Sequence, residues 1–173
     1  MKPKSFCTIC TKNTAYELIG MLLTLSLHHI NANIYILSDE YCKNIIDRIT
    51  PKIKLNIKWV IELNEYSDLN RRSMCAANKW SEFLKNKAKI MLKALEKEED
   101  VLFMDSDIII LDKIEVDKSK CIGLSPQYII DEYVEKTGYY NAGFFWSKSK
   151  DACKYWIDIT VDNHDCPEQL QMA

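Results

Sequence analysis

Two aspartates that stand one residue apart inside an apolar run form the strongest chemical signal in this sequence. Residues 101–104 are apolar, Asp105 and Asp107 flank a serine, and residues 108–111 are apolar again. Continuous apolar runs of this length predict two buried strands that meet at the carboxylate pair. A buried carboxylate is costly unless a cation or hydrogen bonds compensate it. Asp105 and Asp107 are therefore candidate ligands of a divalent cation.

The alternative interpretation of this pair is a solvated turn, which is the usual setting of an isolated Asp-x-Asp. A turn has no need of apolar residues on both sides, so the flanking runs at 101–104 and 108–111 favour the buried strand end. In open α/β sheets the carboxyl ends of the strands are the edge where ligands bind. The sequence therefore predicts a ligand site beside Asp105.

Hydrophobic periodicity predicts strands that alternate with helices along the chain. The expected strands are 5–11, 33–37, 53–63, the two halves of 101–111, 121–125 and 139–147. The expected helices are 15–29 with Thr14 as its cap, 41–49, 80–95 and 148–160, followed by a short segment around Glu168. This order predicts an α/β fold with a mostly parallel sheet and helices on both faces.

The predicted architecture is that of nucleotide-binding proteins, yet the chain has no glycine-rich phosphate loop. Neither G-x-G-x-x-G nor G-x-x-x-x-G-K-[ST] occurs in the sequence. Something else must neutralise any bound phosphates. A cation held by Asp105 and Asp107 would do so.

Length and composition favour one globular domain over residues 1–173. The chain is 47% hydrophobic and 28% charged and has a formal net charge of −2, so no basic surface points to nucleic acid. The amino-terminal residues lack the apolar core of a signal peptide. The longest apolar stretch, 19–27, is interrupted by Gly, Thr and Ser and is too short to span a membrane, so no membrane segment is expected in this chain.

The seven cysteines predict buried thiols rather than disulfides or a zinc site. Only Cys7 and Cys10 have C-x-x-C spacing, and they fall within the first predicted strand without a second pair to complete a zinc site. An odd number of scattered cysteines is typical of a reducing compartment. A cytoplasmic location is therefore expected.

Two motifs together resemble those of the GT-A glycosyltransferases, and among them glycosyltransferase family 8. Residues 101–108 look like the apolar strand and DxD motif of that family, and residues 140–146 look like its N-x-G strand. The resemblance covers most of the chain in element order. It implies a Rossmann-like GT-A domain that uses a nucleotide-diphospho-sugar, most commonly a UDP-sugar, with Mn²⁺ or Mg²⁺ as cofactor. The acceptor would be a carbohydrate, lipid or protein that the motifs do not specify.

The resemblance also implies roles for individual residues. Asp105 would contact the ribose and the metal, and Asp107 would coordinate the metal that bridges the diphosphate. Asn141, beside Ala142 and Gly143, would hydrogen-bond sugar hydroxyls. The remaining residues expected to bind the donor are Thr8, Cys10, Thr11, Asp39, Lys89 and Ser106. Arg71 and Arg72 precede the longest helix and are further candidates for a phosphate contact. For Lys89, Arg71 and Arg72 the favoured alternative is a solvated surface.

Near the carboxyl end, Glu168 and Gln169 resemble an Asp-Gln pair of the family, with glutamate in place of the usual aspartate. The resemblance makes them the candidate catalytic residues, with Glu168 as general base or nucleophile; a helix-start carboxylate is the structural alternative. Family 8 enzymes complete the metal site with a downstream histidine. His164 is a candidate for that position; otherwise water fills it, or the chain is the donor-binding part of a longer protein.

The sequence thus predicts a metal-dependent glycosyltransferase. A non-catalytic donor-binding module or inactive homologue is the main alternative, because the residues that form an acceptor cleft would follow Gln169. A haloacid-dehalogenase-like phosphatase also has a D-x-D after an apolar strand, but there the motif lies near the start of the domain, and the first aspartate is the nucleophile. In this chain only about a third of the residues follow Asp107.

Overall fold

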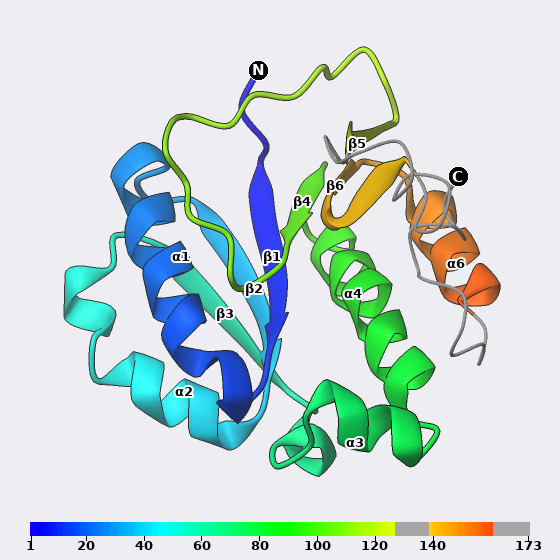
Figure 1. The fold of residues 1–173 in the computed structure, drawn as a ribbon. Helices are drawn as coiled ribbons and strands as arrows, with labels where there is room; N and C mark the ends of the chain where they lie inside the picture. Colours follow the sequence, from blue (N-terminus) through cyan, green and yellow to red (C-terminus); the bar gives the residue numbers. More distant parts are fainter. Residues whose placement is uncertain (127–138, 161–173) are drawn as a thin grey trace.

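The computed structural model describes residues 1–126 and 139–160, which form one sheet of six strands covered by helices on both faces (Figure 1). The strand order is β3-β2-β1-β4-β6-β5. The strands are β1 (Ser5–Cys10), β2 (Asn33–Ser38), β3 (Asn56–Ile61), β4 (Val101–Met104), β5 (Ile122–Pro126) and β6 (Tyr140–Ser147). Strands β1 to β4 pair in parallel, and β6 runs antiparallel to both β4 and β5. The predicted α/β class with a mostly parallel sheet is confirmed.

The helices divide between the two faces of the sheet. They are α1 (Ala15–His28), α2 (Glu40–Asp47), α3 (Arg71–Ala76), α4 (Trp80–Leu95) and α6 (Lys150–Ile159), with short 3-10 turns at Lys12–Thr14, Thr50–Lys52 and Asn64–Tyr66. One apolar core joins α1 and α2 to one face of the sheet. A second core joins α4 and α6 to the other face. Within the described part of the chain, no helix combines the length and apolar character needed to cross a membrane.

Most of the predicted helices and strands occur, with boundaries that differ for local reasons. The predicted strand 53–63 is shortened to Asn56–Ile61, because the 3-10 turn at Pro51 delays its start. The predicted cap Thr14 precedes α1, but its hydroxyl makes no cap bond to that helix and instead donates to the Thr11 carbonyl. Helix α2 does have a side-chain cap, because Asp39 accepts from the Cys42 amide at 2.8 Å.

The prediction of a second strand at residues 108–111 is wrong. After the aspartate pair the chain leaves the sheet, and the 108–116 segment lies along α1. The Ile110 amide donates to Thr24 Oγ1 at 3.1 Å, and the Ile114 amide donates to His29 Nε2 at 2.9 Å. Side chains of α1 and its end thus satisfy backbone groups that a strand partner would otherwise satisfy.

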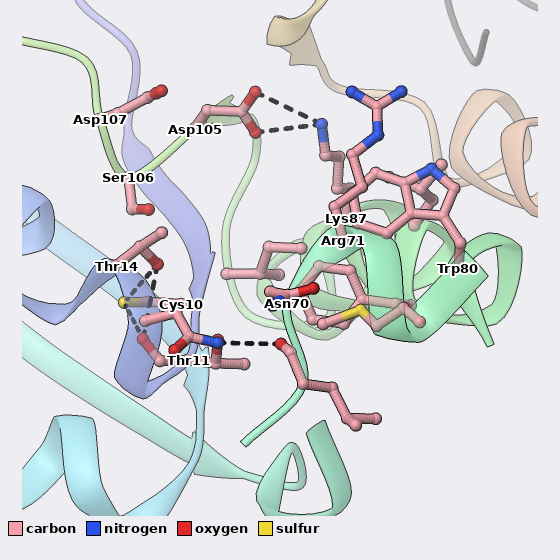
Figure 2. Close-up of a pocket in the computed structure, with 16 residues that line it drawn as sticks. Cys10, Thr11, Thr14, Asn70, Arg71, Trp80, Lys87, Asp105, Ser106 and Asp107 are labelled. Atoms are coloured by element: carbon pink, nitrogen blue, oxygen red, sulfur yellow. Dashed lines mark hydrogen bonds and ion pairs between the residues drawn. The ribbon is translucent and has the colours of Figure 1, made fainter. Parts of the chain in front are cut away.

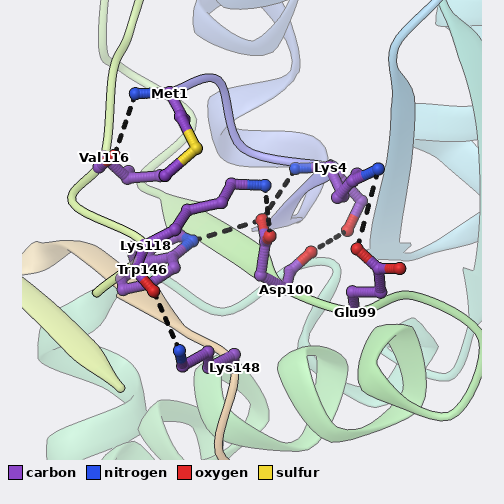
Figure 3. Close-up of polar contacts among 9 residues, drawn as sticks. Met1, Lys4, Glu99, Asp100, Val116, Lys118, Trp146 and Lys148 are labelled. Carbon is purple, nitrogen blue, oxygen red and sulfur yellow. Dashed lines mark hydrogen bonds and ion pairs between the residues drawn. The ribbon is translucent and has the colours of Figure 1, made fainter. Parts of the chain in front are cut away.

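A buried carboxylate binds a lysine that lies just beyond the far end of this segment (Figure 3). Asp100 is 3% exposed and accepts from the Lys4 amide at 2.7 Å, from Trp146 Nε1 at 3.2 Å and from Lys118 Nζ at 2.7 Å. Burial alone would raise the pKa of Asp100, but these donors outweigh it, and the pKa lies below its usual value. Beside this cluster, the amino group of Met1 donates to the Val116 carbonyl at 3.1 Å.

Cysteine burial largely follows the prediction. Cys7, Cys10, Cys42 and Cys153 are buried free thiols, Cys75 is half-buried, and Cys121 is exposed. Burial raises the pKa of Cys7 and of Cys153. Cys7, Cys42 and Cys153 are therefore structural groups of the core, and Cys166 lies outside the described residues.

The hydrogen bond to His29 predicts a dependence of stability on pH. His29 is buried and accepts through Nε2, so it must be neutral; burial, with Lys2, His28 and Lys113 nearby, lowers its pKa. As the pH falls, the unfolded state therefore binds a proton on this histidine before the folded state does. The free energy of unfolding then decreases from about pH 6.5 down to the pKa of His29 in the folded state, by up to about 1.4 kcal/mol per pH unit. Urea unfolding at pH 7.5 and 5.5 measures this loss.

The control for this prediction is a pair of glutamine variants. His29→Gln keeps a neutral acceptor and is expected to flatten the pH dependence over this range. His28→Gln, at the neighbouring position on the last turn of α1, is expected to retain it. Equal pH dependence in His29→Gln and the wild type would contradict the assignment.

Candidate active site

A cavity of about 520 Å³ opens at the carboxyl edge of the parallel strands (Figure 2). The end of β1 supplies Cys10 and Thr11 to its wall, and the residues that follow β4 supply Asp105, Ser106 and Asp107. Helices α3 and α4 form the opposite side. The aspartate pair therefore lies where the sequence predicts a ligand site, at a sheet edge and beside a cavity large enough for a nucleotide-sized molecule.

An ion pair joins the first aspartate to α4. Lys87 Nζ lies 3.1 Å from Asp105 Oδ1 and 3.4 Å from Oδ2. The Lys87 side chain is 7% exposed, and that of Asp105 is 38% exposed. Because the carboxylate faces the cavity while the ammonium is buried, a ligand can reach Asp105 without removing Lys87 from the protein interior. Lys87 also lines the cavity, where the charge of Asp105 largely offsets its own.

Gly143 brings the second sequence motif to the same place. The Asp105 amide donates to the Gly143 carbonyl at 2.9 Å, and the Gly143 amide donates to Asn141 Oδ1 at 2.7 Å. A Cβ at position 143 would lie 2.4 Å from Asp105 Oδ2 and 3.0 Å from Asn141 Oδ1. Only glycine leaves room for both side chains, which explains why this residue follows Asn141 at this spacing.

The second aspartate lies on the open side of the cavity. Asp107 is exposed and Ser106 is buried, and both line the cavity. Within residues 1–126 and 139–160, no three His, Cys, Asp or Glu side chains gather closely enough to hold a metal ion by themselves. Two carboxylate-bearing residues next to a cavity fit a different arrangement, in which Mg²⁺ is held by one or two carboxylates and by the phosphates of a substrate.

Aromatic side chains and an arginine form the wall on α3 and α4. The guanidinium of Arg71 lies 5.2 Å from the Trp80 ring, which stacks on Phe83 with centroids 5.7 Å apart. All three line the cavity. Arg71 thus brings a second cation to the cavity, and the rings present a flat apolar surface.

Comparisons with solved structures identify this fold. Core-mannan synthase A from Aspergillus fumigatus, in its Mn/GDP form, matches with a TM-score of 0.63 and 8% identity over 99% of this chain and 70% of the other. The glycosyltransferase GlyE of Streptococcus pneumoniae TIGR4 matches with a TM-score of 0.61 and 14% identity. The galactosyltransferase LgtC, in complex with donor and acceptor sugar analogs, matches with a TM-score of 0.55 and 17% identity. The chain has the GT-A glycosyltransferase fold.

The match to these glycosyltransferases is a match of structure and not of sequence. The present chain spans 42% of the GlyE chain, with 98% of its own length covered, and 61% of the LgtC chain, with 89% covered. No protein-family model and no curated protein sequence matches it. The likeness therefore establishes the fold, and the chemistry must be argued from the cavity.

The GT-A cavity brings together some of the predicted donor-binding residues and leaves others outside it. Cys10, Thr11, Asp105, Ser106, Asp107 and Arg71 line it. Thr8 is buried within β1, and Ala142 is buried in β6. Asn141 lies beside Asp105 through Gly143. Arg72 is not among the lining residues. Glu168, Gln169 and His164 lie outside the described residues.

Asp39 and Lys89 have other partners in the structure. Besides capping α2, the buried Asp39 carboxylate accepts from the Lys12 amide at 2.8 Å and from Ser67 Oγ at 2.7 Å. Lys89 forms an ion pair with Glu82 on the exposed side of α4. Neither residue lines the cavity. The lysine of α4 that lines the cavity is Lys87, two residues earlier on the same helix.

Sequence reasoning missed Lys87, Trp80 and Phe83 as cavity residues. The signal for Lys87 was its position around the axis of α4: it lies on the apolar side, one turn after Leu84 and one turn before Met91. A charged side chain on that side needs a partner of opposite charge. Trp80 and Phe83 were correctly assigned to the apolar face, but periodicity does not distinguish a core position from a cavity wall.

Proposed function

We propose that this protein binds a nucleotide-diphospho-sugar, with a UDP-sugar as the first candidate, and transfers the sugar to an acceptor with the help of Mn²⁺ or Mg²⁺. The observation that carries the proposal is the meeting of Asp105, Lys87, Gly143 and Asn141 beside the cavity of a GT-A fold. The Mn/GDP form of core-mannan synthase A and the complex of LgtC with donor and acceptor sugar analogs support it. The acceptor remains a carbohydrate, lipid or protein.

The proposed cation is held by Asp107 and Asp105. The carboxylates supply hard oxygen ligands, and the phosphates of the donor supply the others. When bound, the ion stabilises the negative charge that develops on the departing nucleoside diphosphate. The open position of Asp107 on the cavity wall suits a metal that arrives together with its nucleotide.

The other lining residues divide into three proposed roles. Cys10 and Thr11, at the end of β1, border the base and ribose. Arg71 and Lys87 provide positive charge toward the diphosphate, and Lys87 also keeps Asp105 in place. Asn141 uses its amide oxygen for the Gly143 amide, so its NH₂ group is the part that can donate to a sugar hydroxyl.

These groups stabilise sugar transfer through charge and orientation. Bond cleavage at the anomeric carbon leaves a cation-like sugar and a more negative diphosphate. Lys87 is buried and already fixed by Asp105, so little reorganisation accompanies the change in charge. Glu168, as general base or nucleophile, and Gln169 remain the candidate catalytic residues. The buried thiols support a reducing, cytoplasmic location.

A donor-binding module without transferase activity is the second candidate function. It is favoured because the residues that line the cavity suit the binding of a nucleotide, whereas the candidate catalytic residues Glu168 and Gln169 lie outside the described residues. The matched structures are glycosyltransferases, so they give no support to the phosphatase alternative.

Calorimetry followed by a turnover assay tests both functions. UDP, GDP, UDP-glucose, UDP-galactose and GDP-mannose are titrated into the protein in Mn²⁺ and in EDTA, and released nucleoside diphosphate is then measured. Metal-dependent binding with release supports the enzyme, and binding without release in the presence of candidate acceptors supports the module. Failure of every nucleotide to bind in Mn²⁺ would refute both.

The ion pair with Asp105 predicts different effects for two lysines of α4. Lys87→Met is expected to weaken binding of a nucleoside diphosphate by about 10- to 100-fold, because charge-assisted hydrogen bonds are worth about 1.5–3 kcal/mol. Lys89→Met is the matched control and is expected to change affinity by less than about 2-fold. Calorimetry gives the affinities, and thermal unfolding verifies that both variants fold. Equal losses in the two variants would contradict the assignment of Lys87.

A further inference from the structure

The outward face of α1 is apolar along its whole length. Tyr16, Leu27 and Ile30 are 75%, 72% and 59% exposed, and Leu23 is 38% exposed; Ile30 lies just past the end of the helix. The opposite face of the same helix packs on the sheet. A helix on the surface of a globular protein normally carries charged residues on its outer side. This one has apolar residues on both sides, which indicates a partner.

The 108–116 segment widens this apolar surface. Ile109 and Leu111 are 52% and 86% exposed, and the segment runs beside α1 (Figure 1). Ile109 Cδ1 lies 3.1 Å from the position of a Cβ on Gly20, so this side chain fills the space next to the glycine. The two elements thus form one continuous surface, here called the α1 surface: Tyr16, Gly20, Leu23, Leu27, Ile30, Ile109 and Leu111.

The spacing of the helical residues in the α1 surface indicates the kind of partner. Positions 16, 20, 23 and 27 of the helix are separated by four, three and four residues, and Ile30 continues the surface just past the end of the helix. This alternation is the seam through which two helices pack, each side chain fitting between residues of the facing helix. A second helix therefore matches the surface better than an irregular peptide.

The charges at the two ends of the seam indicate which helix and in which direction. No charged residue occurs from Leu18 to Leu27. Glu17 lies in the first turn of α1, and Lys113 lies close to its last turn. An antiparallel copy of the same helix would place each acidic end against a basic end. A two-fold axis near Leu23 makes the surface complementary to itself, as an isologous dimer requires.

We propose that the α1 surface is a homodimer interface in which α1 packs antiparallel against α1 of a second copy. The cavity opens next to the start of α1, where Asn13 and Thr14 line it, so the α1 surface and the cavity are neighbours. This inference does not depend on the proposed transferase function.

Sedimentation equilibrium of the full chain at pH 7.5 tests the dimer. The wild type is expected to show a monomer–dimer equilibrium. Leu27→Glu is expected to raise the dissociation constant by about 100-fold or more, because it buries an unpaired charge. Tyr155→Glu is the matched control: Tyr155 is 66% exposed but lies on α6, on the opposite face of the sheet, and the substitution should leave the constant unchanged.

A charge reversal tests the antiparallel direction. Glu17→Lys is expected to weaken the dimer by about 3- to 10-fold, and the double variant Glu17→Lys with Lys113→Glu to restore it, since surface ion pairs contribute up to about 1 kcal/mol each. A wild type that stays monomeric at all concentrations would overturn the proposal, as would a dimer that Leu27→Glu does not weaken. Failure of the double variant to recover would overturn the antiparallel arrangement. A monomer that binds phosphatidylglycerol vesicles would assign the surface to lipid instead.

Discussion

Replacing Asp107 by asparagine is expected to abolish the metal-dependent part of nucleotide binding. The side chain is exposed at the cavity wall, so the substitution should leave the fold intact. In calorimetry, we expect the wild type to bind UDP about 100-fold more tightly in Mn²⁺ than in EDTA, which is the size of effect found when a metal site is impaired. The variant should bind with the same low affinity in both conditions.

The matched control for Asp107 is Asp112→Asn, five residues further along the chain. Asp112 is exposed and does not line the cavity, and this variant should keep the full difference between Mn²⁺ and EDTA. If the Asp107 variant still responds to Mn²⁺ as the wild type does, the cation is not held at this aspartate. If the wild type binds equally well in EDTA, the proposed cofactor is wrong while the nucleotide site stands.

Adding one methyl group at Gly143 is expected to disrupt the site as strongly as removing a ligand. In Gly143→Ala the new Cβ would lie 2.4 Å from Asp105 Oδ2, so the carboxylate must move away from Lys87 or the strands must separate. Overpacking of this kind costs about 1–3 kcal/mol of stability. We expect nucleotide binding to fall by at least about 30-fold while the protein remains folded at room temperature.

Gly123→Ala serves as the control for this variant. Gly123 also lies in the antiparallel part of the sheet, but a Cβ there would meet Trp146 at 3.5 Å, which is an ordinary contact. Thermal unfolding and UDP calorimetry should show a small change in stability and unchanged affinity. Unchanged affinity in Gly143→Ala as well would mean that the position of Asp105 does not matter for the nucleotide.

The sequence was sufficient to predict the architecture because its local patterns agree with the fold. The apolar runs of β1, β2 and β4 and the helical spacing of α4 lead to the same α/β arrangement. Residues 108–111 were misassigned because an apolar run does not reveal where its backbone hydrogen bonds go. The Ile108 amide donates to the Asp105 carbonyl and the Ile110 amide donates to Thr24 on α1, which periodicity cannot indicate.

The candidate site could be predicted only as far as its motifs reach. Asp105 and Asp107 stand out because they interrupt apolar residues. Lys89 was a candidate only through the family resemblance, whereas helical spacing places Lys89 on the polar side of α4 and Lys87 on its apolar side, as the structure does. The closeness of Asn141 to Asp105 depends on the antiparallel pairing of β6 with β4, which no local pattern specifies.

The pairing of β6 also has a consequence for the newly made chain. β5 leaves the ribosome before β6, yet in the described structure it pairs only with β6. β4 likewise has one free edge until β6 inserts between β4 and β5. A nascent chain that ends before residue 140 therefore leaves uncovered the two strand edges, one on β4 and one on β5, that β6 later pairs with, and such edges favour aggregation. It also lacks Asn141 and Gly143, so the proposed nucleotide site is incomplete until β6 has been synthesised.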